Sequence, residues 1–435
     1  MPIFFQHWLQ TARAYNDGMS LDGGSVAIGL LMLAAVLVAC VLRVTTMDWQ
    51  DEGRLKLRKK LLLTWLAAQL FLAWKYGYVR SDQDHLAFFL MLLPMMALML
   101  EALPASPERW QWAGRAAALA CAAVTFCVMF GASHSFLIKS VDWSAGYAKD
   151  NLRALCEPVS YARQKIELQK VKEAKMLLPV ASQIINRATV DVFGEYPILA
   201  IFNGWNYHPR PVIQSYAACG PQLMELNERF FLSTNAPEFV LLDLDAIDHR
   251  FPAIEDALAL RAVLCNYQLV TNDNVYLVLH HVRNEPAKLK LMREGDVTWG
   301  ARIELTNTAT NLWLALDAQP SLTGWARQML YKEPEVMMSV WSGTNAKPNS
   351  FRVPVSMLKA GFVASPVLLS PTDVGQLCEG KELANATGVL LDQGEAGAGL
   401  WQPEIHYRLY TIENLLPTQG KWAMKPRLAE SLSSQ

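Results

Sequence analysis

The chain has 435 residues, a formal net charge of −1, a hydrophobic content of 52% and a mean hydropathy of +0.13. This balanced charge gives no global basic surface, so nucleic acid is not expected as a partner. The hydropathy indicates strongly apolar segments diluted by a long polar remainder, which has room for two domains of ~100–200 residues each.

Four apolar stretches, each about as long as a bilayer is thick, lie in the first third of the chain. They cover about residues 23–42, 61–79, 86–103 and 116–138. About 20 apolar residues in a helix cross a ~30 Å hydrocarbon core, and a helix satisfies its own backbone amides there. The sequence therefore predicts an α-helical transmembrane segment of four helices within 23–139, after an exterior N-terminal stretch at 1–22.

The charges of the connecting loops predict the orientation. Loop 43–60 contains six Lys and Arg residues, whereas loop 75–85 contains only Lys75 and Arg80. Because positive loops stay in the cytoplasm, both termini are expected outside. The expected location is the bacterial inner (cytoplasmic) membrane, multi-pass, with a periplasmic or extracellular C-terminal region. An exterior start without a signal peptide indicates the C-terminal part of a larger multi-spanning protein.

The next segments predict a linker and then an α/β domain. Helix-forming residues in 140–180 indicate a juxtamembrane helical linker, and a basic face on anionic lipid is the alternative. From 181 to 283, strand and helix patterns alternate, as in a small α/β domain. The expected strands are 188–193, 210–216, 238–245 and two flanking a turn at 271–274, and the expected helices are 221–231 and 254–265.

The last part of the chain has a different pattern. Short alternating runs between Gly, Pro and Asn residues follow one another from 284 to 418, as in a β-sandwich-like domain. Residues 419–435 form a polar tail. The predicted fold class is therefore four transmembrane helices followed by a small α/β domain and a β-sandwich-like domain.

The first candidate site is the hairpin at 74–85. Arg80, Asp82 and His85 follow a run that contains several aromatic residues. These side chains would lie at the depth of the headgroup of a lipid-linked phosphate, where His85 could act as an acid–base group. The alternative is an interfacial aromatic belt with charges that extend to the surface.

The second candidate site is the polar and aromatic run at 203–221. Arg210, with Tyr207, Gln214 and Tyr216, could clamp a phosphate or a sugar, because Arg binds such anions through two hydrogen bonds. The alternative is a structural role, in which Arg210 pairs with Asp191 or Asp248.

Other polar residues give weaker signals. Asp243 and Asp245 at the end of a strand could hold a divalent metal, but a solvated loop is the simpler reading. Cys156, Cys219, Cys265 and Cys378 permit disulfides without requiring them. The common catalytic motifs are absent, so no catalytic residue is assigned, and neither a metal site nor a cofactor is predicted.

Several of these runs carry a resemblance to a known group. KYGYVRSDQDH (75–85), TVDVF (189–193), NGWNYHPRPVIQSYAA (203–218) and APEFVLLDLDAIDHRFPAIEDALAL (236–260) resemble the C-terminal portion of uncharacterised bacterial multi-pass membrane proteins of the GT-C glycosyltransferase-like type. The resemblance spans roughly residues 15–415. It implies a polyprenyl-phosphate sugar as donor and an acidic catalytic residue in the first exterior loop, to which no segment here corresponds.

Together these features predict a membrane glycosyltransferase-like protein of the cell envelope. It would act in cell-surface glycan assembly, with membrane lipid, a polyprenyl-phosphate sugar and a glycan acceptor as partners. The alternative is a non-catalytic membrane-anchored module that binds or assembles polysaccharide or protein partners. The sequence leaves both possibilities open.

Overall fold

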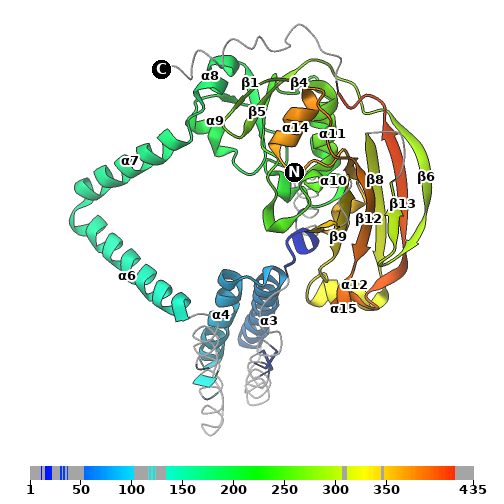
Figure 1. Cartoon of the computed structure of the whole chain (residues 1–435). Coiled ribbons are helices and arrows are strands. Elements are labelled where there is room, and N and C mark those ends of the chain that lie inside the picture. Colours follow the sequence, from blue (N-terminus) through cyan, green and yellow to red (C-terminus); the bar gives the residue numbers. More distant parts are fainter. Residues whose placement is uncertain are drawn as a thin grey trace. The chain divides into compact units, whose positions relative to one another are not determined.

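The structure is a computed structural model of the whole chain (Figure 1). It describes residues 15–21, 53–101, 134–305, 311–343 and 347–416, and the single positions 11, 30, 31, 33, 34, 37, 116, 119, 120 and 123. The chain divides into two compact units. Unit 1 comprises Met1–Ser20, Lys170–Gln328 and Glu333–Gln435, and unit 2 comprises Leu21–Gln169 and Met329–Lys332.

Unit 2 is helical in its described part. Helix α3 (Arg54–Arg80) packs on α4 (Gln83–Glu101), and α6 (His134–Cys156) leads to α7 (Pro158–Lys175), in which the boundary between the units falls. The α3–α4 interface is apolar, and Gly77 allows close approach because a Cβ there would lie 2.7 Å from Phe89 Cβ. The buried residues at this interface are Leu66, Leu70, Ala73, Trp74, Tyr78, Phe89, Leu90, Leu93 and Met96.

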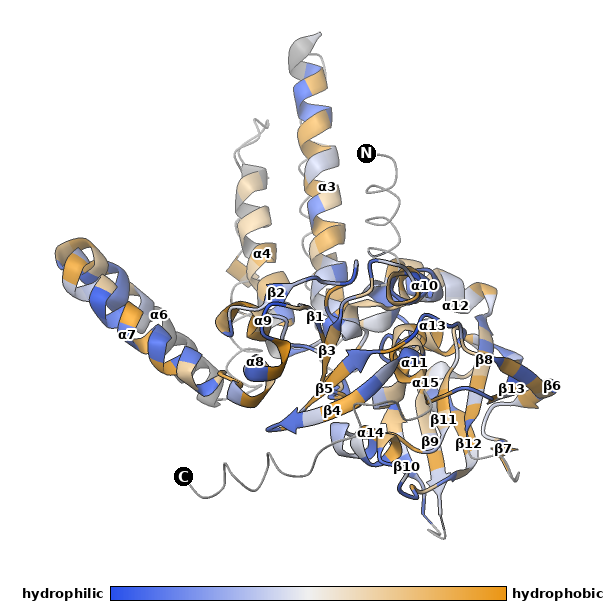
Figure 2. Ribbon diagram, turned by 90° about the horizontal axis from the view of Figure 1, so that it is seen from above, coloured by the Kyte–Doolittle hydropathy of each residue, from blue (hydrophilic) through white to orange (hydrophobic). Residues whose placement is uncertain are grey.

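The structure corrects the predicted transmembrane segment. Among the described residues, no helix combines the length and the apolar character needed to cross a bilayer. Polar residues interrupt α3, as Figure 2 shows, and polar residues at both ends of α4 shorten its apolar run below ~20 residues. This finding overturns the spans at 61–79 and 86–103 and the multi-pass membrane location, with its periplasmic C-terminal region, inferred from them. The stretches 23–42 and 116–138 lie mostly outside the described residues.

Unit 1 begins with a five-stranded sheet in the order β2-β1-β3-β5-β4. Strands β1, β2 and β3 are parallel, and β5 runs antiparallel to β3 and β4. The strands are β1 (Thr189–Phe193), β2 (Asn206–Tyr207), β3 (Phe239–Leu242), β4 (Tyr267–Asp273) and β5 (Tyr276–His281). Successive strand residues point to opposite faces, so Val192 and Leu241 belong to one core cluster and Phe193 and Leu242 to another.

Helices cover both faces of this sheet. The first core cluster includes residues of α8 (Pro179–Ile185) and α9 (Ile198–Phe202), and the second includes residues of α10 (Pro221–Phe231) and α11 (Ala257–Asn266). The predicted helices at 221–231 and 254–265 correspond to α10 and α11. Pro221 in the first turn of α10 suits a position whose N–H would have no partner in the helix.

One predicted strand, 210–216, is wrong. Pro209 and Pro211 have no N–H to donate, and the backbone of Val212 bonds to a side chain instead of to a strand. Asn227 Oδ1 accepts from Val212 N at 2.9 Å, and Asn227 Nδ2 donates to Val212 O at 3.0 Å. The segment therefore runs as a loop, and Ser215–Ala217 form a short 3₁₀ turn.

Two four-stranded antiparallel sheets complete unit 1, in the orders β10-β9-β12-β7 and β11-β8-β13-β6. Figure 1 shows them as two layers, and their buried residues belong to one core cluster that also contains α10 and α11. The strands are β6 (Leu289–Thr298), β7 (Arg302–Glu304), β8 (Leu312–Pro320), β9 (Met337–Ser342), β10 (Asn349–Arg352), β11 (Phe362–Ser365), β12 (Ala386–Asp392) and β13 (Trp401–Ile412). The connecting helices are α12 (Leu322–Leu330), α13 (Val355–Leu358), α14 (Pro371–Cys378) and α15 (Gly394–Gly397).

Candidate functional site

The turn between α3 and α4 in unit 2 gathers three of the predicted site residues. Helix α3 ends at Arg80, and Ser81 adopts the left-handed conformation with a φ of 52°. The Ser81 N–H donates to Gly77 O at 3.1 Å, and Ser81 Oγ donates to Tyr78 O at 2.7 Å. The chain therefore reverses between Arg80 and Gln83, which brings the side chains on either side of the turn together.

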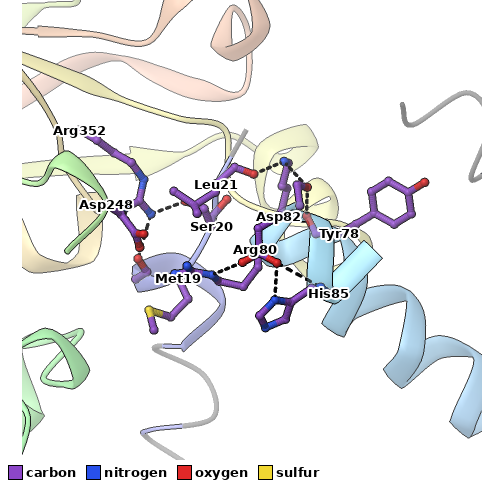
Figure 3. Close-up of polar contacts among 12 residues, drawn as sticks. Met19, Ser20, Leu21, Tyr78, Arg80, Asp82, His85, Asp248 and Arg352 are labelled. Atoms are coloured by element: carbon purple, nitrogen blue, oxygen red, sulfur yellow. Dashed lines mark hydrogen bonds and ion pairs between the residues drawn. The ribbon is translucent and has the colours of Figure 1, made fainter. Parts of the chain in front are cut away.

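Asp82 binds both other side chains of this group (Figure 3). Its Oδ2 accepts from Arg80 Nε at 3.1 Å, and its Oδ1 lies 2.5 Å from His85 Nδ1. Burial acts to raise the pKa of Asp82, but the hydrogen bonds from His85 and Arg80 outweigh it, and the pKa lies below its ordinary value. Asp82 is therefore ionised at neutral pH, and the proton between the two groups belongs to His85 Nδ1.

Asp82 also has a structural role at this position. Its Oδ1 accepts from the backbone N–H of His85 at 3.1 Å, which is the bond that an N-cap residue makes to the third residue of a helix. Asp82 therefore fixes both the start of α4 and the ring of His85.

The second ring nitrogen of His85 is available for chemistry. Within the described part of the chain, His85 Nε2 makes no hydrogen bond, and the side chain is 21% exposed. The ring lies against Tyr76, with their centroids 4.5 Å apart. An imidazole that is held at Nδ1 by a carboxylate, and whose Nε2 makes no hydrogen bond among the described residues, has the arrangement of a general base with its orienting acid.

Arg210, the predicted clamp, lies inside unit 1. Arg210, Asp191 and Asp256 all have 0% side-chain exposure. Arg210 Nη1 binds Asp191 Oδ2 at 2.8 Å, Nε binds Asp256 Oδ2 at 3.0 Å, and Nη2 donates to Ser215 Oγ at 2.8 Å. The structural role predicted that Arg210 pairs with Asp191 or Asp248. Arg210 does pair with Asp191, and its second carboxylate partner is Asp256 instead of Asp248.

This buried group has one guanidinium for two carboxyl groups. Burial raises the pKa of Asp191, and it raises that of Asp256 to about 7 although Arg210 acts in the opposite direction. One positive charge cannot neutralise two carboxylates, so proton uptake by Asp256 near neutral pH relieves the excess negative charge.

The other predicted residues separate into two groups. Within the part of the chain that the structure describes, the buried Tyr207 hydroxyl has no hydrogen-bond partner, and burial, followed by the charge of Asp191, raises its pKa to about 12. Gln214 instead lies beside Glu195, whose carbonyl oxygen accepts from its Nε2 at 3.4 Å. Burial, followed by the charge of Glu195, raises the pKa of Tyr216. Tyr207 therefore belongs with the Arg210 group, whereas Gln214 and Tyr216 adjoin a second acidic region.

That region lies where two parallel strands end. Strands β1 and β3 are neighbours, whereas the chain between them forms β2 on the far side of β1, so the strand order reverses here. The carboxyl ends of parallel strands at such a reversal are the usual ligand site of open α/β sheets. Glu195, Asp243 and Asp245 follow the two strands. Sequence reasoning selected the two aspartates but missed Glu195, which is recognisable only from its place just after β1.

The acids in this region influence one another. Burial raises the pKa of Asp243 to about 6, with further contributions from Asp245 and Glu195. Burial and Asp245 likewise raise the pKa of Glu195. Gly194 allows the strands to meet, because a Cβ there would lie 3.0 Å from both Asp243 Cβ and Asp243 O. Tyr196, beside these acids, is 45% exposed.

Neither metal ligands nor disulfides add to these sites in the described part of the chain. No group of three or more His, Cys, Asp or Glu residues there is arranged to hold a metal ion. The described cysteines Cys156, Cys219, Cys265 and Cys378 are all free. Comparison with protein families, with curated proteins and with solved structures finds no match to the chain.

Proposed function

We propose that this protein transfers a sugar from a polyprenyl-phosphate donor to a hydroxyl group of a glycan acceptor. The observation that carries the proposal is the Asp82–His85 pair at the α3–α4 turn. The ring of His85 is fixed at Nδ1, its Nε2 makes no hydrogen bond among the described residues, and its side chain is 21% exposed. The choice of donor and acceptor rests on the resemblance of the sequence to glycosyltransferase-like proteins.

The reaction needs a base, which His85 supplies. His85 Nε2 removes the proton of the acceptor hydroxyl while the acceptor oxygen forms a bond to the anomeric carbon. The bond from that carbon to the phosphate oxygen breaks, and polyprenyl phosphate leaves with the electron pair. Asp82 stabilises the imidazolium that forms, since it is ionised and bonded to Nδ1.

The test separates the catalytic role of Asp82 from its role in starting α4. Asp82→Asn keeps an N-cap side chain, because Asn caps helices as well as Asp, but it removes the charge opposite His85. Both Asp82→Asn and His85→Gln should lower the rate of transfer by about 10²–10⁴-fold, the usual contribution of an acid–base group. The rate is measured as labelled sugar that passes from a polyprenyl-phosphate hexose to a glycan acceptor.

A second His–Asp pair in the chain supplies the control. His406 Nδ1 lies 2.9 Å from Asp296 Oδ1 on the surface of unit 1. His406→Gln should therefore leave the rate unchanged. A His85→Gln variant that transfers sugar at the wild-type rate would exclude His85 as the base.

The alternative function, glycan binding without catalysis, is supported by a different observation. Acidic Glu195, Asp243 and Asp245 and the exposed ring of Tyr196 lie together at the carboxyl ends of β1 and β3. Carboxylates accept hydrogen bonds from sugar hydroxyls, and a tyrosine ring offers a flat apolar face for a sugar ring. This region would hold a segment of polysaccharide.

A different variant tests the glycan-binding function. Tyr196→Ala should weaken polysaccharide binding by about 2- to 12-fold, the effect of losing ~0.5–1.5 kcal/mol of ring contact. Tyr147→Ala, which alters a tyrosine of unit 2 that is 55% exposed, is the matched control. Calorimetric titration with a panel of polysaccharides measures the effect. Binding that Tyr196→Ala leaves intact would remove the support for this function.

A further inference from the structure

The segment Asp17–Ser20 is bound by two buried arginines of unit 1. Arg250 Nη2 donates to Gly18 O at 2.6 Å, and Arg352 Nη2 donates to the same oxygen at 2.9 Å. Arg352 also donates to Ser20 O, as Figure 3 shows, and Ser20 Oγ donates to Glu333 O at 2.7 Å. Side chains from distant parts of the sequence therefore bind the main chain of a short N-terminal segment.

The fit between this segment and its site is close at Gly18. A Cβ at this position would lie 2.2 Å from the Sγ atom of Cys219 and 2.6 Å from its Cβ. Cys219 itself is buried, with 2% exposure, and its Sγ donates to Tyr216 O at 3.1 Å. The docked segment therefore covers the Cys219 thiol, and only glycine at position 18 allows it to do so.

Two carboxyl groups face each other within this contact. Glu333 is buried, with 4% exposure, and its carboxyl group is hydrogen-bonded to that of Asp17. Two carboxylates cannot bond to each other, so a proton lies between them. Among the described residues, the charged groups around the segment include Arg250 with its partner Glu255, Arg352 with Asp248 at 4.0 Å and Glu335 at 3.9 Å, and the buried Lys332 next to Glu333 in the chain.

We propose that Asp17 and Glu333 form a pH-operated latch, in which loss of their shared proton releases the segment Asp17–Ser20 and uncovers Cys219. Without the proton, two negative charges meet in a buried place. Arg352 attracts the Glu333 carboxylate, but it is also engaged by Asp248 and Glu335. The main-chain contacts of Gly18 and Ser20 are lost when the carboxylates separate.

The direction of the pH effect follows from the pKa of Glu333. Burial raises this pKa well above its ordinary value, and the charge of Asp17 and their hydrogen bond raise it further. A group whose pKa is raised on docking binds its proton more tightly in the docked state. Docking is therefore fully favoured at low pH and is weakened as the pH rises through the raised pKa.

The experiment measures how fast Cys219 is alkylated in the full chain. Iodoacetamide labels Cys219 and the exposed Cys156, and mass spectrometry gives the ratio of their rates between about pH 5 and about pH 8. Cys156 serves as the internal reference for the reagent. We expect the ratio to rise with pH in the wild-type chain.

Variants test whether the latch causes the rise of the Cys219-to-Cys156 labelling ratio with pH. Glu333→Gln and Asp17→Asn each keep a hydrogen bond without the shared proton, so each should lower the ratio at about pH 8 by about tenfold, the equivalent of one pH unit of proton linkage. Glu404→Gln, which changes an exposed acid on β13, should behave as wild type. Gly18→Ala should give a high ratio at every pH. A ratio that does not change with pH in the wild-type chain, or that rises equally in both Glu333→Gln and Asp17→Asn, would overturn the proposal.

Discussion

Arg210 interacts with two carboxyl groups in a part of unit 1 that has no contact with solvent. Its side chain also lies over the ring of Phe193, with the guanidinium carbon 4.6 Å from the ring centroid. Removal of one member of a buried ionic group leaves the others without compensation, which costs more than the intact group contributes. The residues around Arg210 therefore make it a strong determinant of stability.

Arg210→Met should lower the free energy of unfolding by about 3–5 kcal/mol, because it leaves Asp191 and Asp256 buried without a cation. Urea unfolding measures the loss. Arg229→Met, which changes an exposed arginine on α10, should stay within about 0.5 kcal/mol of wild type. The triple variant Arg210→Met with Asp191→Asn and Asp256→Asn should recover part of the loss. A loss below about 1 kcal/mol would contradict the structural role and favour a ligand-binding role for Arg210.

At the scale of elements, periodicity predicted those strands whose apolar residues face a core. The runs at 188–193 and 238–245 contain β1 and β3, and strands β6 to β13 lie in the region of short alternating runs from 284 to 418. The run at 210–216 has the same alternation, but the side chain of Asn227, from α10, hydrogen-bonds to the backbone N–H and C=O of Val212. Asn227 makes the backbone hydrogen bonds that a neighbouring strand would otherwise make. The alternation of residues within 210–216 does not reveal this distant side chain, so the segment could not be predicted as a loop.

Asn227 fixes that loop to α10, and its removal should be costly. It also donates to Asp256 Oδ2 at 2.7 Å, so Asn227→Ala removes a hydrogen bond from one buried carboxylate oxygen and from two partly buried backbone groups. We expect a loss of about 1–3 kcal/mol or more in the free energy of unfolding. Asn235→Ala, at an exposed position, should change it by less than about 0.5 kcal/mol. Equal stability of the two variants would show that the 210–216 loop does not depend on this anchor.

The helices that were predicted to cross a membrane show a different limit of the sequence pattern. The length of an apolar run does not reveal how its residues are used, and in α3 and α4 several of them form a helix–helix core. The run at 61–79 includes Gln69 and Lys75, and α4 is bounded by polar residues at both ends. Helix formation was predictable from these runs, whereas their role was not.

At the scale of the whole molecule, contacts between residues close in sequence were easier to predict than contacts between distant ones, although the Arg210–Asp191 pair was one of the two alternatives considered. Asp82 and His85 are three residues apart and meet across a single turn, so their contact follows from the sequence near them. Glu195 and Asp243 follow different strands, β1 and β3, and their proximity depends on the order β2-β1-β3. Arg210 and Asp256 meet through tertiary packing alone. Long-range pairings of this kind require the sheet order, which periodicity does not provide.

Buried acids also set the pH dependence of the stability of unit 1. Burial raises the pKa of Asp243 to about 6 and those of Glu255 and Asp256 to about 7, although Arg250 and Arg210 oppose the last two shifts. All three values lie above those of an unfolded chain, so the folded state binds more protons. The stability gained from these groups is complete below about pH 4 and is lost as the pH rises through 6 to 7.

We therefore expect the free energy of unfolding to fall by at least about 1.4 kcal/mol between about pH 5 and about pH 8. This is the energy of a pKa difference of one unit between the folded and unfolded states for a single group. Urea unfolding followed by tryptophan fluorescence at several pH values measures this fall. Asp256→Asn and Glu255→Gln should each make it smaller, because neither side chain ionises. Glu404→Gln, at an exposed position on β13, should leave it unchanged. Stability that is constant or increases over this range would show that the buried carboxyl groups stay ionised and that their arginine partners compensate them fully.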